Sequence, residues 1–211
     1  MKKIDNIRID YNLNSLNKSD LLACPLKQFE LWFNEVVNDI IEPTAMTLST
    51  YSTKYGCQSR VVLLKEFRSD GFVFFTNYNS LKAKQINLNN NVSLAFFWPN
   101  FQRQIRINGL AKQISDSESV NYFEQRPRGS QISAWVSDQS QIIDSRDDLD
   151  LEFKKIEKRF KDQAIPKPPN WGGYLIQPLS VEFWQGRQDR MHDRILYLKN
   201  NDTWIINRLS P

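Results

Sequence analysis

Alternation of apolar and polar residues dominates the middle and the end of this 211-residue chain, and helical spacing is confined to separate segments. The alternating runs are short, rich in Val, Ile and Phe, and separated by turn-forming residues such as those at 69–71, which is typical of strands. Connections this short leave little room for parallel crossovers, so we expect antiparallel pairing. The predicted strands span residues 45–51, 60–67, 72–76, 92–98, 103–114, 173–185, 194–199 and 203–208.

Helical spacing predicts five helices around these strands. The first begins near Ser19 and Asp20, accommodates Pro25 in its first turn and is ended by Pro43. The others span 80–89, from a capping-box sequence at 115–118 to residue 127, from 130 to about 137, and 147–163. This order predicts a mainly β chain of the α+β class, an antiparallel barrel with flanking helices. We expect the polar residues 1–18 to form a mobile N-terminal arm and 19–211 to form a single domain.

Composition and charge exclude several classes of function. With 40% hydrophobic and 25% charged residues, the chain has ordinary globular composition, and no run approaches the ~20 apolar residues of a membrane span. We therefore expect no membrane partner and, since no secretory signal is visible, a cytoplasmic location. Cys24 and Cys57 are too few for a disulfide scaffold and match no zinc spacing, so we interpret them as reduced thiols and expect no metal. The net charge of +4 is spread along the chain, which favours pockets for phosphorylated small molecules over a nucleic-acid surface.

The strongest chemical signal is the run from Arg190 to Arg194, which contains His192, the only histidine of the chain. If the run is extended, Arg190, His192 and Arg194 point to one side of the strand. Two guanidiniums beside an imidazole suit a planar, anionic ligand. A solvated strand edge is the simpler alternative.

Two further segments carry the residues of a phosphate site. Arg60 and Lys65 flank a buried-looking strand, although alternation places them on opposite faces unless a bulge intervenes. Ser80 and Lys82 stand at a helix N-terminus, whose free N–H groups and dipole favour anions. The alternative for Arg60 and Lys65 is that their charges only mark the ends of the strand. The alternative for Ser80 and Lys82 is an ordinary helix cap with a surface lysine.

A third segment brings together two hydroxyls and a guanidinium. Tyr122 and Arg126 share one helical face, and Ser130 follows at the next predicted helix start. Convergence of these groups would form a phosphate cradle, although an arginine is also favourable at any helix C-terminus. No P-loop, nucleophile or dinucleotide-binding motif occurs in the sequence.

The order of these motifs resembles the pyridoxine (pyridoxamine) 5′-phosphate oxidase family over residues 43–211. The matching segments include Arg103-Gln104, Arg126-Pro127-Arg128, Ala134-Trp135-Val136-Ser137, Trp171-Gly172-Gly173, Glu182 to Gly186, Arg190 to Arg194 and the terminal Arg208-Leu209-Ser210-Pro211. The resemblance implies a homodimeric FMN-binding split barrel with each flavin at the subunit interface. It also implies oxidation of pyridoxine and pyridoxamine 5′-phosphates to pyridoxal 5′-phosphate by O2, with release of H2O2 and, from the amine, of NH3.

The resemblance further assigns residue roles. It implies FMN binding by Arg60, Val61, Val62, Leu63, Leu64, Lys65, Phe75, Thr76, Lys82, Gln104, Gln139, Ser140, Trp184 and Arg194. It implies substrate binding by Arg8, Tyr11, Lys65, Tyr122, Arg126, Ser130, Arg190 and His192, the last two also being catalytic.

The sequence departs from the family pattern at two places. Many members carry a tyrosine where Phe75 stands and an arginine where Leu81 stands, so the second departure removes a contact to the FMN phosphate. Two other functions remain open at this point: a different split-barrel flavin enzyme such as an FMN reductase, and a non-catalytic carrier of FMN or pyridoxal phosphate.

Overall fold

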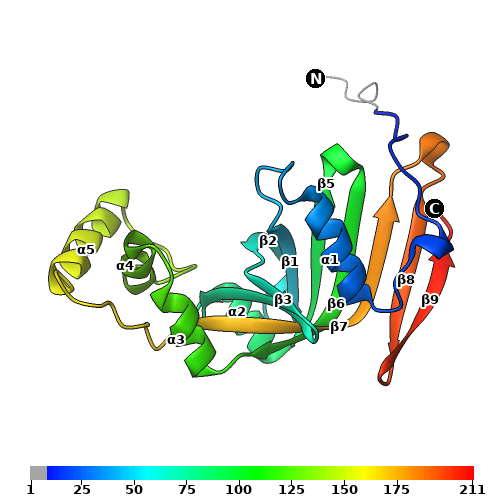
Figure 1. The fold of residues 1–211 in the computed structure, drawn as a ribbon. Coiled ribbons are helices and arrows are strands. Elements are labelled where there is room, and N and C mark those ends of the chain that lie inside the picture. The colour runs from blue at the N-terminus through cyan, green and yellow to red at the C-terminus, as the bar shows by residue number, and fades with distance from the viewer. Residues whose placement is uncertain (1–8) are drawn as a thin grey trace.

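The computed structural model describes residues 9–211, and the strands of this part of the chain form one antiparallel sheet (Figure 1). Its first six strands in spatial order pair as β2-β1-β5-β6-β7-β4, followed by the short β3. The strands span β1 Ala45–Ser52, β2 Gly56–Leu63, β3 Glu66–Arg68, β4 Gly71–Asn77, β5 Asn91–Trp98, β6 Arg103–Gln113, β7 Trp171–Gln185, β8 Asp193–Asn200 and β9 Thr203–Leu209. The predicted strands are thus confirmed to within a few residues, except that 60–67 belongs to two strands.

This division of the 60–67 segment curls the sheet into a split barrel. β2 pairs with β1 at one end of the strand order and β3 pairs with β4 at the other, yet only Leu64 and Lys65 separate them. The N–H of Leu64 donates to Thr44 O at 2.8 Å, and the N–H of Lys65 donates to Val73 O at 2.9 Å. The chain therefore changes its pairing partner between these two residues, and the predicted fold class is confirmed.

Strand β7 is long enough to pair with different strands along its first and last parts. Its first part, from Trp171 to Ile176, pairs with β4, and its last part, from Ser180 to Gln185, pairs with β8. β9 pairs with β8 alone, so these two strands form a ribbon that extends to one side of the barrel (Figure 1).

The five predicted helices are present but differ from the prediction at their ends, most of all the first, which ends at Val36 and not at Pro43. They span α1 Pro25–Val36, α2 Leu81–Leu88, α3 Asp116–Glu124, α4 Arg128–Val136 and α5 Arg146–Arg159, with short 3₁₀ turns at Lys18–Asp20, Pro99–Phe101 and Gln188–Arg190. α1 begins at Pro25, because proline lacks the N–H that a first helical residue leaves unpaired. Ser130 lies inside the first turn of α4, whose N-cap is Pro127, and is not the predicted cap. Ser80 and Ser115 do cap their helices.

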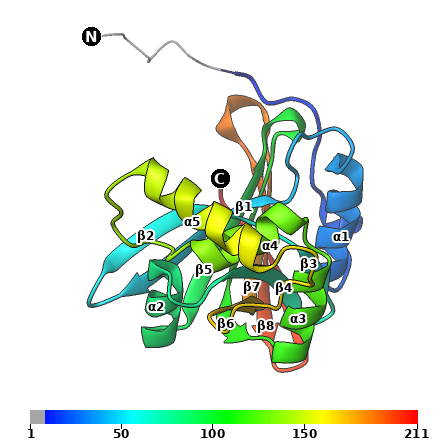
Figure 2. The same ribbon diagram turned by 90° about the vertical axis from the view of Figure 1, so that its left-hand side faces the viewer.

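Two hydrophobic clusters hold these elements together. In the larger one, the ring of Phe29 from α1 lies 4.9–5.2 Å from the rings of Phe67, Phe72 and Phe96, so α1 closes one opening of the barrel. The smaller cluster joins α3, α4 and α5 to the start of β7 through Phe123, Ile132, Ile156, Phe160, Ile165 and Trp171. Figures 1 and 2 place α4 and α5 at the end of the molecule opposite to β8 and β9.

The run from Arg190 to Arg194 is not extended throughout, which was the condition for Arg190, His192 and Arg194 to point to one side of a strand. Asp189 and Arg190 have φ of 54° and 60°, the left-handed region, and β8 begins only at Asp193. The predicted alternation of side chains therefore fails before Asp193. Residues 9–17 contain no helix or strand, yet Leu13 N–H donates to the side chain of Gln102 at 3.2 Å. Within residues 9–211, no helix is long and apolar enough to cross a membrane.

Candidate functional site

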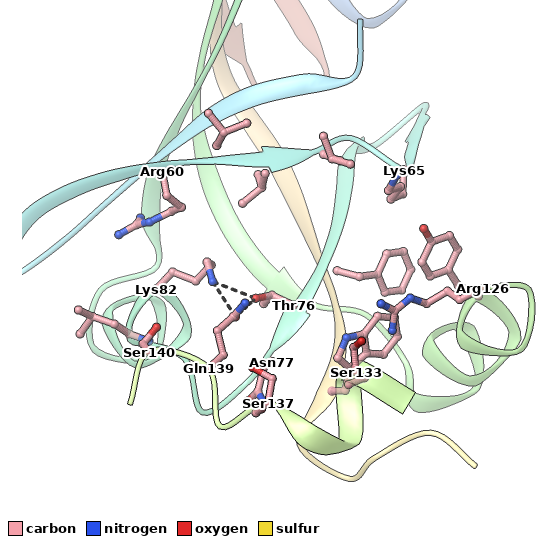
Figure 3. Close-up of a pocket in the computed structure, with 18 of the residues that line it drawn as sticks. Arg60, Lys65, Thr76, Asn77, Lys82, Arg126, Ser133, Ser137, Gln139 and Ser140 are labelled. Carbon is pink, nitrogen blue, oxygen red and sulfur yellow. Dashed lines mark hydrogen bonds between the residues drawn. The ribbon is translucent and has the colours of Figure 1, made fainter. Parts of the chain in front are cut away.

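A cavity of about 810 Å³ lies between β2, β4, α3, α4 and the N-terminus of α2 (Figure 3). Its volume is that of a typical small-molecule site. Four cationic side chains line it, Arg60, Lys65, Lys82 and Arg126, and its lining includes no aspartate or glutamate. Lys65 is exposed, but Arg60, Lys82 and Arg126 are partly buried, and partly buried cations without a carboxylate partner are costly unless an anion joins them. The cavity is therefore suited to an anionic ligand.

The cations stand in two pairs at opposite ends of the cavity. Figure 3 shows Arg60 and Lys82 at one end, Lys65 and Arg126 at the other, and Thr76 and Gln139 between them. Alternation along one unbroken strand would place Arg60 and Lys65 on opposite faces. Because the chain breaks between β2 and β3, both residues line the cavity. The cavity can therefore bind two anionic groups, one at each cationic end.

At the first end, Lys82 is held by neutral oxygens alone among the contacts of the described residues. Its Nζ donates to Gln139 Oε1 at 2.9 Å and to Thr76 Oγ1 at 3.2 Å. Burial, together with the charge of Arg60, lowers the pKa of Lys82 to about 8. A bound anion would restore its charged form.

Arg60 is oriented by a buried polar network. Its Nη1 donates to Thr50 Oγ1 at 2.6 Å and to Leu48 O at 3.2 Å. Thr50 in turn donates to Gln85 Oε1 at 2.6 Å, and the Gln85 amide donates to Gly56 O. These contacts fix one edge of the guanidinium, so its direction is set before any ligand binds.

The loop after α4 completes this end of the cavity. Ser140, with φ of 73°, accepts a hydrogen bond at 3.3 Å from the backbone N–H of Leu81, the first residue of α2. Gln139 contacts both Lys82 and Thr76. The loop thus covers the helix N-terminus that the sequence predicted as an anion site.

The second end is built on stacked aromatic rings. The Phe75 ring lies 3.9 Å from that of Tyr122 and 5.3 Å from that of Trp171, with interplanar angles of 14° and 11°. The guanidinium of Arg126 lies 4.7 Å from the Trp171 ring centroid. Burial lowers the pKa of Arg126 and raises that of Tyr122.

Arg126 has unused hydrogen-bonding capacity. Its Nη1 is buried and has no hydrogen-bond partner among the described residues. An orphaned guanidinium nitrogen beside a cavity is costly unless a ligand oxygen satisfies it. The residues at this end therefore fit a phosphate group.

The structure brings most of the predicted site residues together in this cavity. They are Arg60, Val61, Val62, Leu63, Lys65, Phe75, Thr76, Lys82, Tyr122, Arg126, Gln139 and Ser140. Leu64 is buried in the core, and Ser130 is not part of the lining, whereas Ser133, three residues further along α4, is. Arg8 lies outside the described residues.

The remaining predicted residues lie on β6, β7 and β8, in the turn before β8 and in the N-terminal segment, and we call them the second cluster: Tyr11, Gln104, Trp184, Arg190, His192 and Arg194. Gln104 is the register partner of Trp184, and the Trp184 ring lies 4.6 Å from His192 and 5.7 Å from Tyr11. Arg194, also a register partner of Trp184, donates from Nε to Glu182 Oε1 at 2.8 Å. None of these residues lines the cavity, and β8 lies at the opposite end of the molecule from α4 (Figure 1).

Sequence reasoning gave no role to three residues of these two clusters. Trp171 supports Arg126, Ser133 lines the cavity, and Glu182 accepts hydrogen bonds from both Arg194 and Arg106. The Trp171-Gly172-Gly173 segment was part of the resemblance, and it was the only sequence signal for any role of Trp171. No group of three or more potential metal ligands occurs within residues 9–211.

The split barrel and its carboxylate-free cationic cavity define a binding protein for phosphorylated ligands. A family model described as pyridoxamine 5′-phosphate oxidase matches residues 33–160, and one described as the pyridoxine 5′-phosphate oxidase C-terminal dimerisation region matches residues 171–211. The chain therefore belongs to the pyridoxine/pyridoxamine 5′-phosphate oxidase family.

Full-length relatives carry the same family name. The pyridoxine/pyridoxamine 5′-phosphate oxidase of Aliarcobacter butzleri is 48% identical, with 99% of each chain covered, and that of Flavobacterium johnsoniae is 47% identical, with 100% of each covered. Among solved structures, PhzG from Burkholderia lata 383, in complex with tetrahydrophenazine-1-carboxylic acid, superposes with a TM-score of 0.88 at 25% identity, covering 94% of this chain and 99% of that one. An FMN-binding protein from Nostoc punctiforme shares the fold, with a TM-score of 0.72 at 17% identity, covering 90% and 100%.

Proposed function

We propose that this protein is an FMN-dependent oxidase that converts pyridoxine 5′-phosphate and pyridoxamine 5′-phosphate to pyridoxal 5′-phosphate. Dioxygen is the electron acceptor and is reduced to H2O2, and NH3 is released from the amine. The observation that carries the proposal is the presence of two cation pairs, Arg60 with Lys82 and Lys65 with Arg126, at the two ends of one carboxylate-free cavity. Cofactor and substrate each bring one phosphate, so each pair has a partner.

The two ends receive different phosphates in this proposal. The FMN phosphate is bound by Arg60 and Lys82, which lie beside Thr76 and the N-terminus of α2. The substrate phosphate is bound by Lys65, Tyr122 and Arg126, whose orphaned Nη1 supplies a free donor.

The second cluster reaches the cavity from a partner subunit in a symmetric homodimer. Gln104, Trp184, Arg190, His192 and Arg194 do not line the cavity of their own chain, and β8 lies at the opposite end of the molecule from α4 (Figure 1). Four of these five residues lie in 171–211, the segment that matches a dimerisation region. A twofold axis places the same cluster of one protomer against the cavity of the other, and so completes two identical sites.

Within this site the protein binds and orients, and FMN when bound supplies the redox chemistry by accepting a hydride from the C4′ carbon and passing electrons to O2. Arg190 and His192 hold the pyridine ring, and the Lys65/Arg126 end holds its phosphate. No carboxylate or histidine lines the cavity of the described chain. The main catalytic contribution of these side chains is therefore orientation of the reacting C–H bond.

The direct test is formation of pyridoxal 5′-phosphate from each phosphorylated substrate by purified protein with added FMN, with and without O2. Unphosphorylated pyridoxine should be a poor substrate, because it cannot use the Lys65/Arg126 end. Equal turnover of both forms would contradict the assignment of that end. Oxidation of NAD(P)H without pyridoxal phosphate formation would indicate an FMN reductase, and FMN binding without any turnover would indicate a carrier. We place this activity in the cytoplasm, where the free thiols of Cys24 and Cys57 stay reduced.

A further inference from the structure

The carboxylate of Asp193, the first residue of β8, joins three other segments of the chain. Its Oδ2 accepts hydrogen bonds from the backbone N–H of Leu16 and from Nη1 of Arg187, each at 3.0 Å, and its Oδ1 accepts from Arg208 on β9. The side chain is 14% exposed. Burial alone would raise the pKa of Asp193, but the hydrogen bonds from Leu16 and Arg208 and the charges of Arg187 and Arg208 lower it. Asp193 is therefore a carboxylate anion that ties the N-terminal segment, the turn after β7 and β9 together.

Arg187, one of the residues held by Asp193, contacts the imidazole of His192. Its backbone N–H donates to His192 Nδ1 at 3.1 Å. This donor requires a lone pair on Nδ1, so the neutral ring carries its proton on Nε2. Burial and the charge of Arg190 lower the pKa of His192, which favours that neutral ring. His192 thus offers Nε2–H as a hydrogen-bond donor.

The turn between Arg187 and His192 needs an anchor. Asp189 and Arg190 have φ of 54° and 60°, and residues other than glycine keep such angles only when their surroundings hold them. The ion pair between Arg187 and Asp193 spans this turn and links its two ends. The pair therefore fixes where the N–H of Arg187 lies relative to the imidazole.

We propose that Asp193 is a positioning residue for His192. It binds the side chain of Arg187 and so fixes the backbone N–H that selects the Nε2–H form of the imidazole. The same carboxylate accepts a hydrogen bond from the N–H of Leu16. The anchoring of the N-terminal segment and the tautomer of His192 therefore both depend on Asp193. The proposal rests on the function proposed above only in giving His192 a role at the substrate.

The test uses the fact that His192 is the only histidine of the chain. Protein labelled with ¹⁵N-histidine therefore gives the NMR signals of this ring alone. The wild type should show one tautomer, with the proton on Nε2. Asp193→Asn keeps the shape of the side chain and removes its charge, whereas Arg187→Ala keeps the N–H and removes its tether. Both variants should show averaged tautomers, with the two nitrogen shifts drawn together.

Two further variants make the result specific. Asp150→Asn breaks the exposed ion pair with Arg146 on α5 and should leave the ring signals unchanged, while Arg187→Lys should restore part of the wild-type pattern. Wild-type tautomer signals in folded Asp193→Asn and Arg187→Ala would overturn the proposal. If Asp193→Asn does not fold, Arg187→Ala decides alone, because the Arg187 side chain is 42% exposed. The NMR measurement needs neither FMN nor turnover, so an inactive protein with the expected tautomer changes would refute the oxidase function and support the positioning role.

Discussion

The guanidinium of Arg126 lies 4.7 Å from the ring centroid of Trp171, over a residue that is itself stacked on Phe75. Arg126 comes from the segment between α3 and α4, and Trp171 is the first residue of β7. The contact therefore ties the helical part of the site to the barrel, and the indole supports an arginine that has no carboxylate partner among the residues described.

Replacing Trp171 should weaken the phosphate end of the cavity without affecting the FMN end. A partly buried cation–π contact contributes about 1 kcal/mol, so Trp171→Leu should raise KM for pyridoxine 5′-phosphate roughly fivefold. Trp171→Phe should recover part of the loss, and FMN affinity should change little in either variant. A loss of FMN affinity equal to the loss of substrate affinity would contradict the separation of the two ends.

Binding of the FMN phosphate should depend on pH through Lys82. Burial and Arg60 lower the pKa of Lys82 to about 8 in the free protein, and an anion binds the charged form more tightly. The lysine is charged below this pKa, so the dissociation constant of FMN should be lowest there and should increase as the pH rises through about 8. Fluorescence titrations of FMN from about pH 7 to 10 measure this.

Substitution of the lysine identifies the group responsible. Lys82→Met should weaken FMN binding about tenfold or more near pH 7, the cost of one charge-assisted hydrogen bond, and should flatten the pH profile. Lys84→Met, an exposed position on the same helix, is the matched control and should keep the profile. A rise of the dissociation constant through pH 8 that persists in Lys82→Met would assign the titration to another group.

Leu81 lines the FMN end of the cavity and cannot donate a hydrogen bond to a phosphate. Leu81→Arg should therefore tighten FMN binding about tenfold, with a steeper dependence on salt because the new contact is ionic. Leu88→Arg adds the same charge at an exposed site of α2 and should have a small effect. Unchanged affinity in Leu81→Arg would mean that another residue already fills this place.

The strand pattern could be predicted from the sequence because one face of most strands is buried. Alternation is clear in β5 and β6, where apolar side chains enter the core and Arg106 and Asn108 stay exposed. The capping box of Ser115 and Glu118 was equally predictable, because its two hydrogen bonds involve residues only three positions apart.

Features that depend on tertiary contacts could not be predicted. The turn at Asp189 and Arg190 uses left-handed angles without glycine, so nothing local marked it in the sequence, and it is held by the pairing of Arg187 with Asp193. Trp171 lies just before the predicted strand 173–185, so no periodic pattern assigned it a position, and its contact with Arg126 forms only when the start of β7 packs on the helical part of the site.

The central claim is that one chain supplies the cationic cavity while its partner supplies His192 to the same site. Two variants test it most directly: Arg126→Ala damages the cavity, and His192→Ala damages the second cluster. Each homodimer should form little pyridoxal 5′-phosphate. In a mixed dimer both substitutions fall in one of the two sites, and the other site is complete. Purified mixed dimers should therefore have about half of wild-type activity. Random co-assembly should recover about a quarter, because only about half of the dimers are mixed. Mixed dimers no more active than either parent would show that the site does not combine residues of two chains.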